Sequence, residues 1–214
     1  GAYVTWARLL MAHGDRTGLE KVVAQAQPHA GRFSAARRLE LEVLAATAAG
    51  DAARRRKALE EISRTTPAGA DVFRQLAAEN YRARRFDEAA GNFRRALELE
   101  PGDAAAWNQL GYTEALRGNL AGAREALTRY QRLAPEDANP LDSLGDVHYL
   151  LGAFAEAEKY YLQAVAKNRL FLGGADLYKA ARARLMVGDV AGADGLFRRY
   201  LEGLNPAQDP LVAY

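Results

Sequence analysis

The chain has no cysteine among its 214 residues and only three histidines. Without cysteine, disulfides and thiol chemistry are excluded, and the redox compartment is left undetermined. His13, His29 and His148 are far apart in the sequence, and none has a second histidine at the spacing that zinc sites use. The sequence therefore predicts no metal ion and no cofactor, and His148 is expected to be a half-buried packing residue.

Long apolar runs are also missing. No stretch approaches the ~18 apolar residues that a membrane span needs, and no signal peptide is visible at Gly1. We expect a soluble protein without membrane insertion. The arginine-rich composition is typical of a GC-rich bacterial source, and cytoplasm and periplasm are both left open. The abrupt ends, Gly1 and Tyr214, suggest a segment of a longer chain, which leaves flanking domains open.

Catalytic motifs are scarce. None of the three serines lies in a Gly-x-Ser-x-Gly turn, and Gly173-Gly174 lacks the lysine of a phosphate-binding loop. Asp142 and Asp146 stand four residues apart on one expected helix, the spacing of an acid/base pair. Two carboxylates on an open helix face more often are solvated or bind a basic ligand, so we do not expect an enzyme.

The charge balance is too even for a nucleic-acid groove, which normally concentrates basic residues. Lysine plus arginine total 29 against 27 aspartate plus glutamate, a net charge of +2. The basic clusters at 54–57 and 82–85 are followed closely by acidic residues, which is typical of a solvated helix face. Residues 101–150 carry four basic and seven acidic groups, a net of −3, which favours a cationic partner there.

A 34-residue period runs through the chain. Pro67, Pro101 and Pro135 stand 34 residues apart, and the apolar positions Leu59, Phe93 and Leu127 keep the same spacing. A fixed period of this length indicates stacked copies of one small unit. We divide residues 1–214 into six frames of one array, with a two-residue insertion before the last: 1–35, 36–69, 70–103, 104–137, 138–173 and 174–207.

Each frame is expected to form two helices joined by a turn. Apolar residues at helical spacing form a first run of about 14 residues, helix A, and a glycine commonly follows, often with Asp or Asn after it. Glycine adopts the left-handed conformation that ends a helix, and Asp or Asn caps the next one, helix B. A proline then ends helix B, because the residue before proline is disfavoured in the helical region.

The unit resembles the tetratricopeptide repeat. The frame at 104–137 carries the resemblance with Trp107, Leu110, Gly111, Ala123, Leu127 and Pro135. Arg55 and Arg169 depart from the pattern, one replacing the small alanine of helix B and the other the closing proline, so those joints are expected to pack less regularly. The resemblance implies an all-α fold, a right-handed superhelical solenoid of about six repeats, whose A helices line a concave groove.

The resemblance also implies a function and a set of groove residues. The expected function is a protein–protein interaction scaffold that holds a peptide segment or a partner protein in the groove. The second, fifth, ninth and twelfth places of each frame would face the ligand. These places hold Arg37, Glu40, Asp71, Arg74, Tyr81, Asn108, Tyr112, Asn139, Asp142, Asp146, Tyr149, Tyr178 and Arg182.

Three alternatives stay open at this point. The groove tyrosines can equally be the amphipathic wall that any such array needs. The array can bind nucleic acid, although none is expected, or it can be purely structural, associating with another copy of itself or with a neighbouring domain. The carboxylate clamp of chaperone-binding members is set aside, because the corresponding places hold Glu40 and Leu44, Arg74 and Ala78, and Asn108 and Tyr112.

Overall fold

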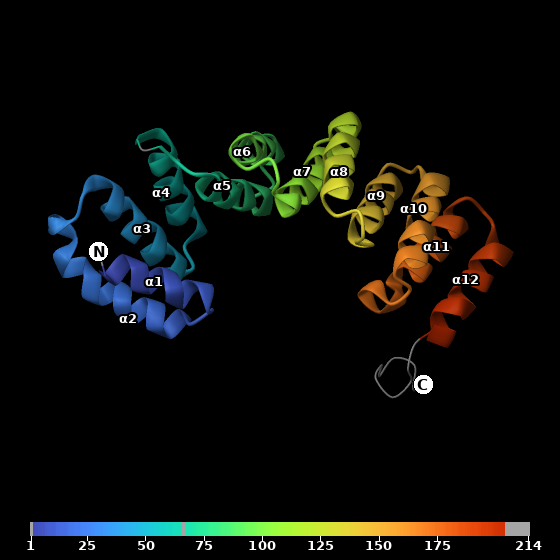
Figure 1. Ribbon diagram of the computed structural model, residues 1–214, viewed down its shortest axis with the longest axis horizontal. Helices are drawn as coiled ribbons and strands as arrows, with labels where there is room; N and C mark the ends of the chain where they lie inside the picture. Colours follow the sequence, from blue (N-terminus) through green and yellow to red (C-terminus); the bar gives the residue numbers. More distant parts are fainter. Residues whose placement is uncertain (1, 66, 204–214) are drawn as a thin grey trace. The chain divides into compact units, whose positions relative to one another are not determined.

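The fold is all-helical. The computed structural model describes residues 2–65 and 67–203, which contain twelve α-helices and two short 3₁₀ turns but no strand (Figure 1). The first six helices are α1 (Ala2–Ala12), α2 (Arg16–Ala26), α3 (Ala35–Ala49), α4 (Ala52–Thr65), α5 (Ala70–Arg82) and α6 (Phe86–Leu99). The others are α7 (Ala104–Leu116), α8 (Leu120–Leu133), α9 (Asn139–Leu150), α10 (Phe154–Lys167), α11 (Ala175–Met186) and α12 (Val190–Gly203). The 3₁₀ turns are η1 (Gln27–Arg32) and η2 (Phe171–Gly174). The predicted all-α repeat fold is confirmed.

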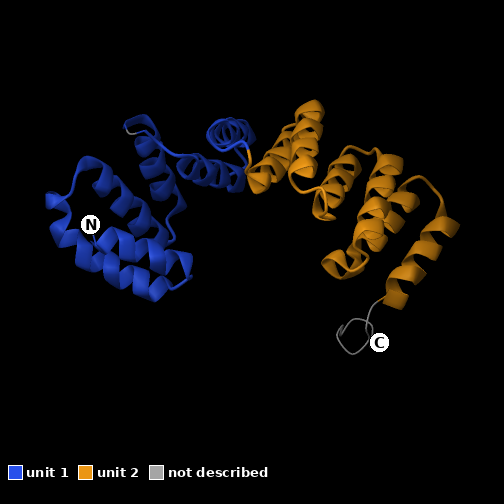
Figure 2. Cartoon of the chain, in the orientation of Figure 1, with its two compact units in different colours: residues 1–101 blue, residues 102–214 orange. Residues whose placement is uncertain are grey.

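The chain divides into two compact units, unit 1 (Gly1–Pro101) and unit 2 (Gly102–Tyr214) (Figure 2). Helices α1 to α6 belong to unit 1 and helices α7 to α12 to unit 2. Each of the six predicted frames contains two α-helices, although residues 204–207 of the last frame lie outside the described residues. That residues 1–214 form one continuous array stays a prediction.

Prolines end the B helices where the sequence predicts. Helices α2, α4, α6 and α8 each end two residues before a proline, at Pro28, Pro67, Pro101 and Pro135. In the next frame Arg169 replaces the proline, α10 ends at Lys167, and the two-residue insertion forms η2. Leu172 adopts a left-handed conformation there with φ of 48°. The irregular joint expected at Arg169 is thus a short, strained turn.

The turns between paired helices follow the predicted chemistry. Gly14, Gly50, Gly118, Gly152 and Gly188 all have positive φ, between 71° and 86°. Asp15, Asp51, Asn119 and Asp189 follow four of these glycines and accept a hydrogen bond from a backbone N–H three residues later. The frame at 70–103 differs, because Arg84 takes the left-handed position with φ of 58°.

Small residues let the two helices of a pair approach closely. Ala89, Ala123, Ala157 and Ala193, near the start of four B helices, are 0% exposed. On helix A, a Cβ atom at Gly111 would lie 2.6 Å from the Leu127 side chain, and one at Gly145 would lie 2.5 Å from the Tyr161 ring. Steric exclusion therefore explains why glycine stands at these two places.

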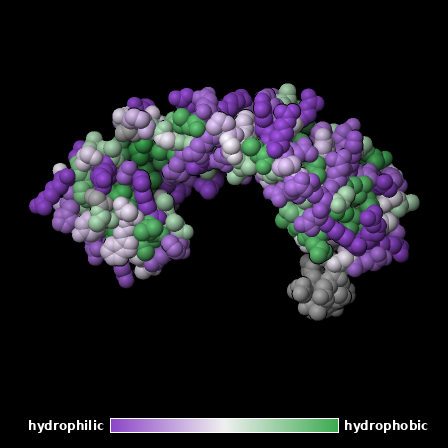
Figure 3. Space-filling model, in the orientation of Figure 1, coloured by the Kyte–Doolittle hydropathy of each residue, from purple (hydrophilic) through white to green (hydrophobic). Residues whose placement is uncertain are grey.

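The largest apolar side chains of α1 do not all lie in the core. Val4 and Ala7 pack in the core of unit 1, whereas Trp6 and Leu9 are 53% and 55% exposed. On the visible face of each unit, hydrophobic residues are interspersed with a larger number of hydrophilic ones (Figure 3). Isolated exposed apolar side chains of this kind are ordinary for protein surfaces.

Candidate functional site

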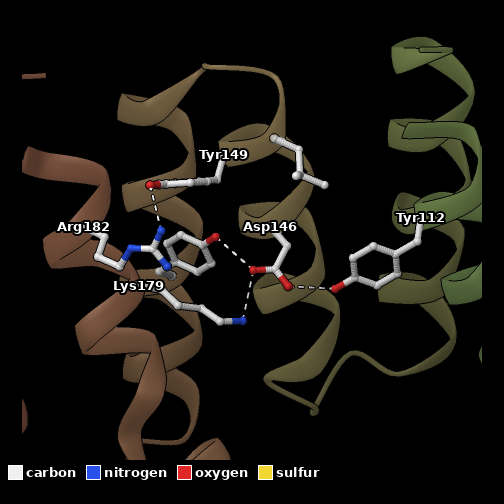
Figure 4. A pocket seen from close by; sticks show the side chains of 7 residues that line it. Tyr112, Asp146, Tyr149, Lys179 and Arg182 are labelled. Carbon is white, nitrogen blue, oxygen red and sulfur yellow. Dashed lines mark hydrogen bonds and ion pairs between the residues drawn. The ribbon is translucent and has the colours of Figure 1, made fainter. Parts of the chain in front are cut away.

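A pocket of about 250 Å³ lies on the A helices of unit 2. Its lining combines tyrosine rings with charged side chains from α7, α9 and α11, together with one tyrosine of α10 (Figure 4). The lining residues are Tyr112, Asp146, Tyr149, Leu150, Tyr161, Lys179 and Arg182. We refer to this as the tyrosine pocket.

Asp146 is the centre of a hydrogen-bond network in the tyrosine pocket. Tyr112 donates its hydroxyl to Oδ2 of Asp146 at 2.9 Å, and Tyr161 donates to Oδ1 at 2.9 Å. The ammonium of Lys179 lies 3.0 Å from the same Oδ1. The three groups belong to α7, α10 and α11, and Figure 4 shows Tyr112 and Lys179 approaching the carboxylate from different helices. Asp146 is therefore held by the protein itself and offers little acceptor capacity to a ligand.

Burial keeps the two tyrosine hydroxyls protonated. It raises the pKa of both Tyr112 and Tyr161 above the ordinary value of 10.0, and the negative charge of Asp146 raises them further. Both phenols consequently remain hydrogen-bond donors over the whole physiological pH range.

Lys179 joins two carboxylates of α9. Its ammonium forms ion pairs with Asp142 and with Asp146 and lies 5.5 Å from the centroid of the Tyr161 ring. Burial lowers the pKa of Lys179, but the hydrogen bonds and charges of the two aspartates outweigh burial and raise it. Asp142 is only 4% exposed. The expectation that Asp142 and Asp146 lie on an open helix face is wrong for Asp142, because α11 covers it with Lys179.

A third carboxyl, Asp176, is buried beside Asp142. It is 1% exposed, and neither of its oxygens has a hydrogen-bond donor next to it. Burial, the contact with Asp142 and the charge of Asp142 raise the pKa of Asp176 to about 8, while Lys179 acts in the opposite direction. Asp176 is thus mostly protonated at pH 7, which lets two carboxyls share a buried site.

Arg182 stands at the exposed edge of the tyrosine pocket. Its guanidinium carbon lies 5.3 Å from the centroid of the Tyr149 ring and 5.9 Å from that of Tyr178, and Nη2 donates to the Tyr149 hydroxyl at 3.3 Å. Stacking on two rings orients the guanidinium. Because that hydrogen bond uses one of five N–H donors, Arg182 retains donors for a ligand.

Six predicted groove residues come together in unit 2. Four line the tyrosine pocket, and two contact its lining residues: Asp142 through Lys179, and Tyr178 through Arg182. The six are Tyr112, Asp142, Asp146, Tyr149, Tyr178 and Arg182.

The other seven predicted groove residues lie outside the tyrosine pocket. Arg37 and Glu40 lie on α3 and Asp71 on α5, all in unit 1, and Glu40 pairs with Arg8. Arg74 and Tyr81 belong to unit 1, where Arg74 pairs with Glu100 and Tyr81 packs edge-on against Phe86. Asn139 accepts a long hydrogen bond of 3.5 Å from Ser143, and Asn108 has a buried Oδ1 without a partner.

Tyr161, Lys179 and Asp176 were not predicted as site residues from the sequence. Tyr161 is 2% exposed, so its ring packs in the core, while its hydroxyl donates to Asp146. Lys179 occupies the sixth place of its frame, outside the places considered. Its spacing from Asp142 and Asp146 is 37 and 33 residues, close to one repeat. Opposite charges one period apart are the signal that could have found it.

Within the ranges 2–65 and 67–203, no group of three or more His, Cys, Asp or Glu side chains could hold a metal ion. His148 packs against the Tyr160 ring at 5.1 Å, and burial lowers its pKa. His148 is therefore a half-buried packing residue, as predicted.

Two comparisons point to one family. The family profile described as tetratricopeptide repeat matches residues 73–138. A TPR repeat-containing protein of Pseudomonas aeruginosa is 40% identical over 77 residues. Together with the fold, these matches support the tetratricopeptide repeat family for this chain. The matched segment is 36% of this chain and only 13% of the Pseudomonas protein.

Solved TPR structures have the same fold. A tetratricopeptide repeat protein from Parabacteroides merdae superposes with a TM-score of 0.73 at 12% identity, covering 96% of this chain and 80% of that one. YrrB, described as a TPR protein with an unusual peptide-binding site, gives 0.66 at 20% identity, covering 78% and 84%. TPR proteins are generally non-enzymatic scaffolds, and the fold suggests protein partners. Among the described residues, no helix has the length and apolar character of a membrane span.

Proposed function

We propose that this protein is an interaction scaffold that binds an extended peptide segment of a partner protein along the A helices of unit 2. The tyrosine pocket is the centre of this surface. The observation that carries the proposal is Arg182, which is exposed, is oriented by two tyrosine rings and retains free N–H donors. The fold shared with YrrB, a protein described as having a peptide-binding site, supports the same interpretation.

The charges of the pocket favour an acidic group in the peptide. The sequence alone suggested a cationic partner, from the excess of acidic residues at 101–150. Lys179, however, pairs with Asp142 and Asp146, so these carboxylates are already neutralised in part. Arg182 is left as the charged group directed to solvent, and a carboxylate binds a guanidinium with two parallel hydrogen bonds.

The tyrosine rings provide the remaining contact area. Tyr178 is 43% exposed, and Tyr149 is half-buried. A flat aromatic face with a polar tip suits contact with the side chains and amides of an extended peptide. We therefore expect a peptide with one Asp or Glu at Arg182 and an apolar or aromatic residue beside it.

Random-peptide phage selection on the intact protein, followed by fluorescence anisotropy of the enriched peptides, tests this proposal. Arg182→Gln should weaken binding at least about 10-fold, equivalent to ~1.4 kcal/mol, because it removes the charge that pairs with the peptide. Arg199→Gln is the matched control, since Arg199 is exposed on α12 and does not line the pocket. Equal losses for both variants, or enriched peptides without acidic residues, would contradict the proposal.

Alanine substitutions of the tyrosines are unsuitable as tests. Both tyrosines also contribute to packing, since Tyr112 packs against the core cluster of α8 and α9 and Tyr149 against the core cluster of α10 to α12. Tyr149→Phe removes only the hydroxyl and should weaken peptide binding less than Arg182→Gln does.

A further inference from the structure

Unit 1 has its own pocket on the A helices, separate from the tyrosine pocket. It has a volume of about 300 Å³, close to the lower end of the roughly 300–1,000 Å³ that ligand sites occupy. This size suits one or two side chains rather than a folded partner. Its lining comes from α1, α3, α4 and α5: Arg8, Met11, Glu40, Val43, Leu44, Leu59, Ile62, Asp71, Val72 and Gln75. We call it the unit 1 pocket.

The floor of the unit 1 pocket is apolar and well fixed. It lies where two core clusters meet, one containing Leu44 and the other containing Val43 and Leu59. These three side chains are 3%, 8% and 1% exposed, whereas Met11 is 39% exposed. A rigid apolar floor with a partly exposed methionine favours an apolar side chain as the occupant.

The rim of the unit 1 pocket carries an excess of negative charge. Arg8 pairs with Glu40 at 3.2 Å, which leaves Asp71 as the second carboxylate. The Asp71 side chain is 72% exposed, accepts a hydrogen bond from Gln75 at 2.9 Å, and lies 4.0 Å from Arg74. One arginine and two carboxylates line the pocket, so its rim complements a basic residue next to the apolar one.

The repeat frames show why the two pockets differ. The ninth place of a frame is Tyr112, Asp146 and Arg182 in the three frames of unit 2. In the frame at 36–69 the same place is Leu44, which is buried in the pocket floor. The same position of the repeat is therefore polar in unit 2 and apolar in this frame of unit 1, and the two pockets suit different ligand groups.

We propose that the unit 1 pocket is a second peptide subsite, which takes one leucine- or methionine-sized side chain followed by a lysine or arginine that pairs with Asp71. The apolar floor supplies the binding energy and Asp71 supplies the preference for a basic neighbour. The subsite does not depend on the acidic peptide proposed for the tyrosine pocket, because no residue lines both.

The two methionines of the chain allow a direct test. Met11 lines the unit 1 pocket, and Met186 is 55% exposed on α11 of unit 2, so it serves as an internal control. Protein labelled with ¹³C at the methionine methyl groups is titrated with the capped tetrapeptide Gly-Leu-Lys-Gly. The Met11 resonance, assigned with Met11→Leu, should shift saturably with a Kd of about 1 mM or weaker, which is expected of a single anchored side chain. The Met186 resonance should stay in place.

Sequence variants of the probe establish the chemistry on the wild-type protein. Gly-Asn-Lys-Gly should leave Met11 unshifted, and Gly-Leu-Glu-Gly should bind at least about 3-fold more weakly than Gly-Leu-Lys-Gly. Asp71→Lys should remove the difference between the Lys and Glu peptides, whereas Glu61→Lys, an equal charge change at an exposed position outside the pocket, should preserve it. The proposal is overturned by equal shifts with the Leu and Asn peptides, by parallel shifts of Met186, or by a Met11 shift that depends on protein concentration without peptide and so reports a second copy of the chain.

Discussion

At the residue scale, Gly145 decides how the tyrosine pocket is assembled. The absence of a side chain at this position lets the Tyr161 ring lie against α9, where a Cβ atom would stand 2.5 Å from it. In this position the Tyr161 hydroxyl reaches Asp146, the next residue along α9. One glycine thus links the packing of two helices to the geometry of the site.

Gly145→Ala should destabilise the protein by about 1–3 kcal/mol, because Tyr161 is nearly fully buried and has little room to move. Urea denaturation measures the change. Gly91→Ala is the control, since Gly91 lies within α6 and a Cβ atom there would meet nothing within 4 Å, so alanine should stabilise by about 1 kcal/mol. Similar effects of the two substitutions would show that α9 and α10 are not closely packed at this point.

Asp176 predicts a specific dependence of stability on pH. Its pKa rises from 3.8 to about 8 on folding, so the folded state holds a proton that the unfolded state has released between these values. The stability that this proton contributes is complete below about pH 4 and is lost as the pH rises towards 8. Asp142, Asp146 and Lys179 are the charged groups that act on the pKa of Asp176.

Asp176→Asn removes this titration while preserving the shape of the side chain. Relative to wild type, the variant should gain stability as the pH rises from 4 to 9, by at least about 1 kcal/mol, the equivalent of less than one pKa unit. Thermal unfolding at several pH values measures the difference in stability between the variant and wild type. The contributions of the other titrating groups to this difference largely cancel. A difference that is constant with pH would mean that Asp176 is not buried as described.

At the scale of elements, the turn between α5 and α6 is the exception among the turns that join paired helices. Arg84 has φ of 58° where the corresponding turns have glycine, and a left-handed conformation costs a non-glycine residue roughly 1–2 kcal/mol. Its guanidinium lies 5.9 Å from the centroid of the Phe86 ring, a contact that offsets part of this cost.

Arg84→Gly should therefore stabilise the protein by about 0.5–1 kcal/mol, because relief of the backbone strain exceeds the added flexibility of glycine in the unfolded chain. Gly118→Ala, at the same position one frame later with φ of 81°, should destabilise it by about 1 kcal/mol. Both are measured by urea denaturation. If Arg84→Gly instead lowers the stability, the lost contact with Phe86 contributes more free energy than the relief of backbone strain.

At the scale of the whole molecule, repeat architecture predicts that damage stays local. In stacked repeats each repeat contacts only the repeats next to it. A local defect therefore raises the rate of amide hydrogen exchange mainly in its own repeat and the adjacent ones. Ala123→Leu overpacks the cluster that contains Leu127 and Leu144 and should cost about 1–3 kcal/mol. Amide exchange should accelerate in α7 to α9, while α1 to α4 keep their wild-type protection. Uniform acceleration in all helices would indicate a single cooperative unit instead.

Much of the fold follows from residues that repeat. The prolines that follow the B helices, the glycines in the turns and the alanines between paired helices predicted twelve helices in six pairs, because each of these residues acts through backbone geometry or close packing with a sequence neighbour. The left-handed conformation of Arg84 was not predicted, since it departs from the repeating pattern, and at Arg169 the sequence predicted an irregular joint but not the conformation of η2.

The candidate site was predictable only in part. Placing Tyr112, Asp146 and Arg182 on one face required only the period, because equivalent positions of successive A helices lie next to each other. Tyr161 and Lys179 were not predicted. A buried tyrosine ring gives no sign in the sequence of where its hydroxyl lies, and the only sequence signal for Lys179 is its spacing of about one repeat from Asp142 and Asp146. Their roles depend on the positions of the Tyr161 hydroxyl and the Lys179 ammonium, which lie several bonds away from the backbone.

The sequence by itself determined the repeat and the approximate ends of the helices, because these depend on local backbone preferences and on a period of 34 residues. Only the tertiary structure decided the chemistry of the two pockets. Lys179 partly neutralises Asp142 and Asp146 across 33 to 37 residues of sequence, which changes the proposed ligand group in unit 2 from a cation to an anion. Charges interact through distance in space, and that distance is set by the packing of side chains from different helices.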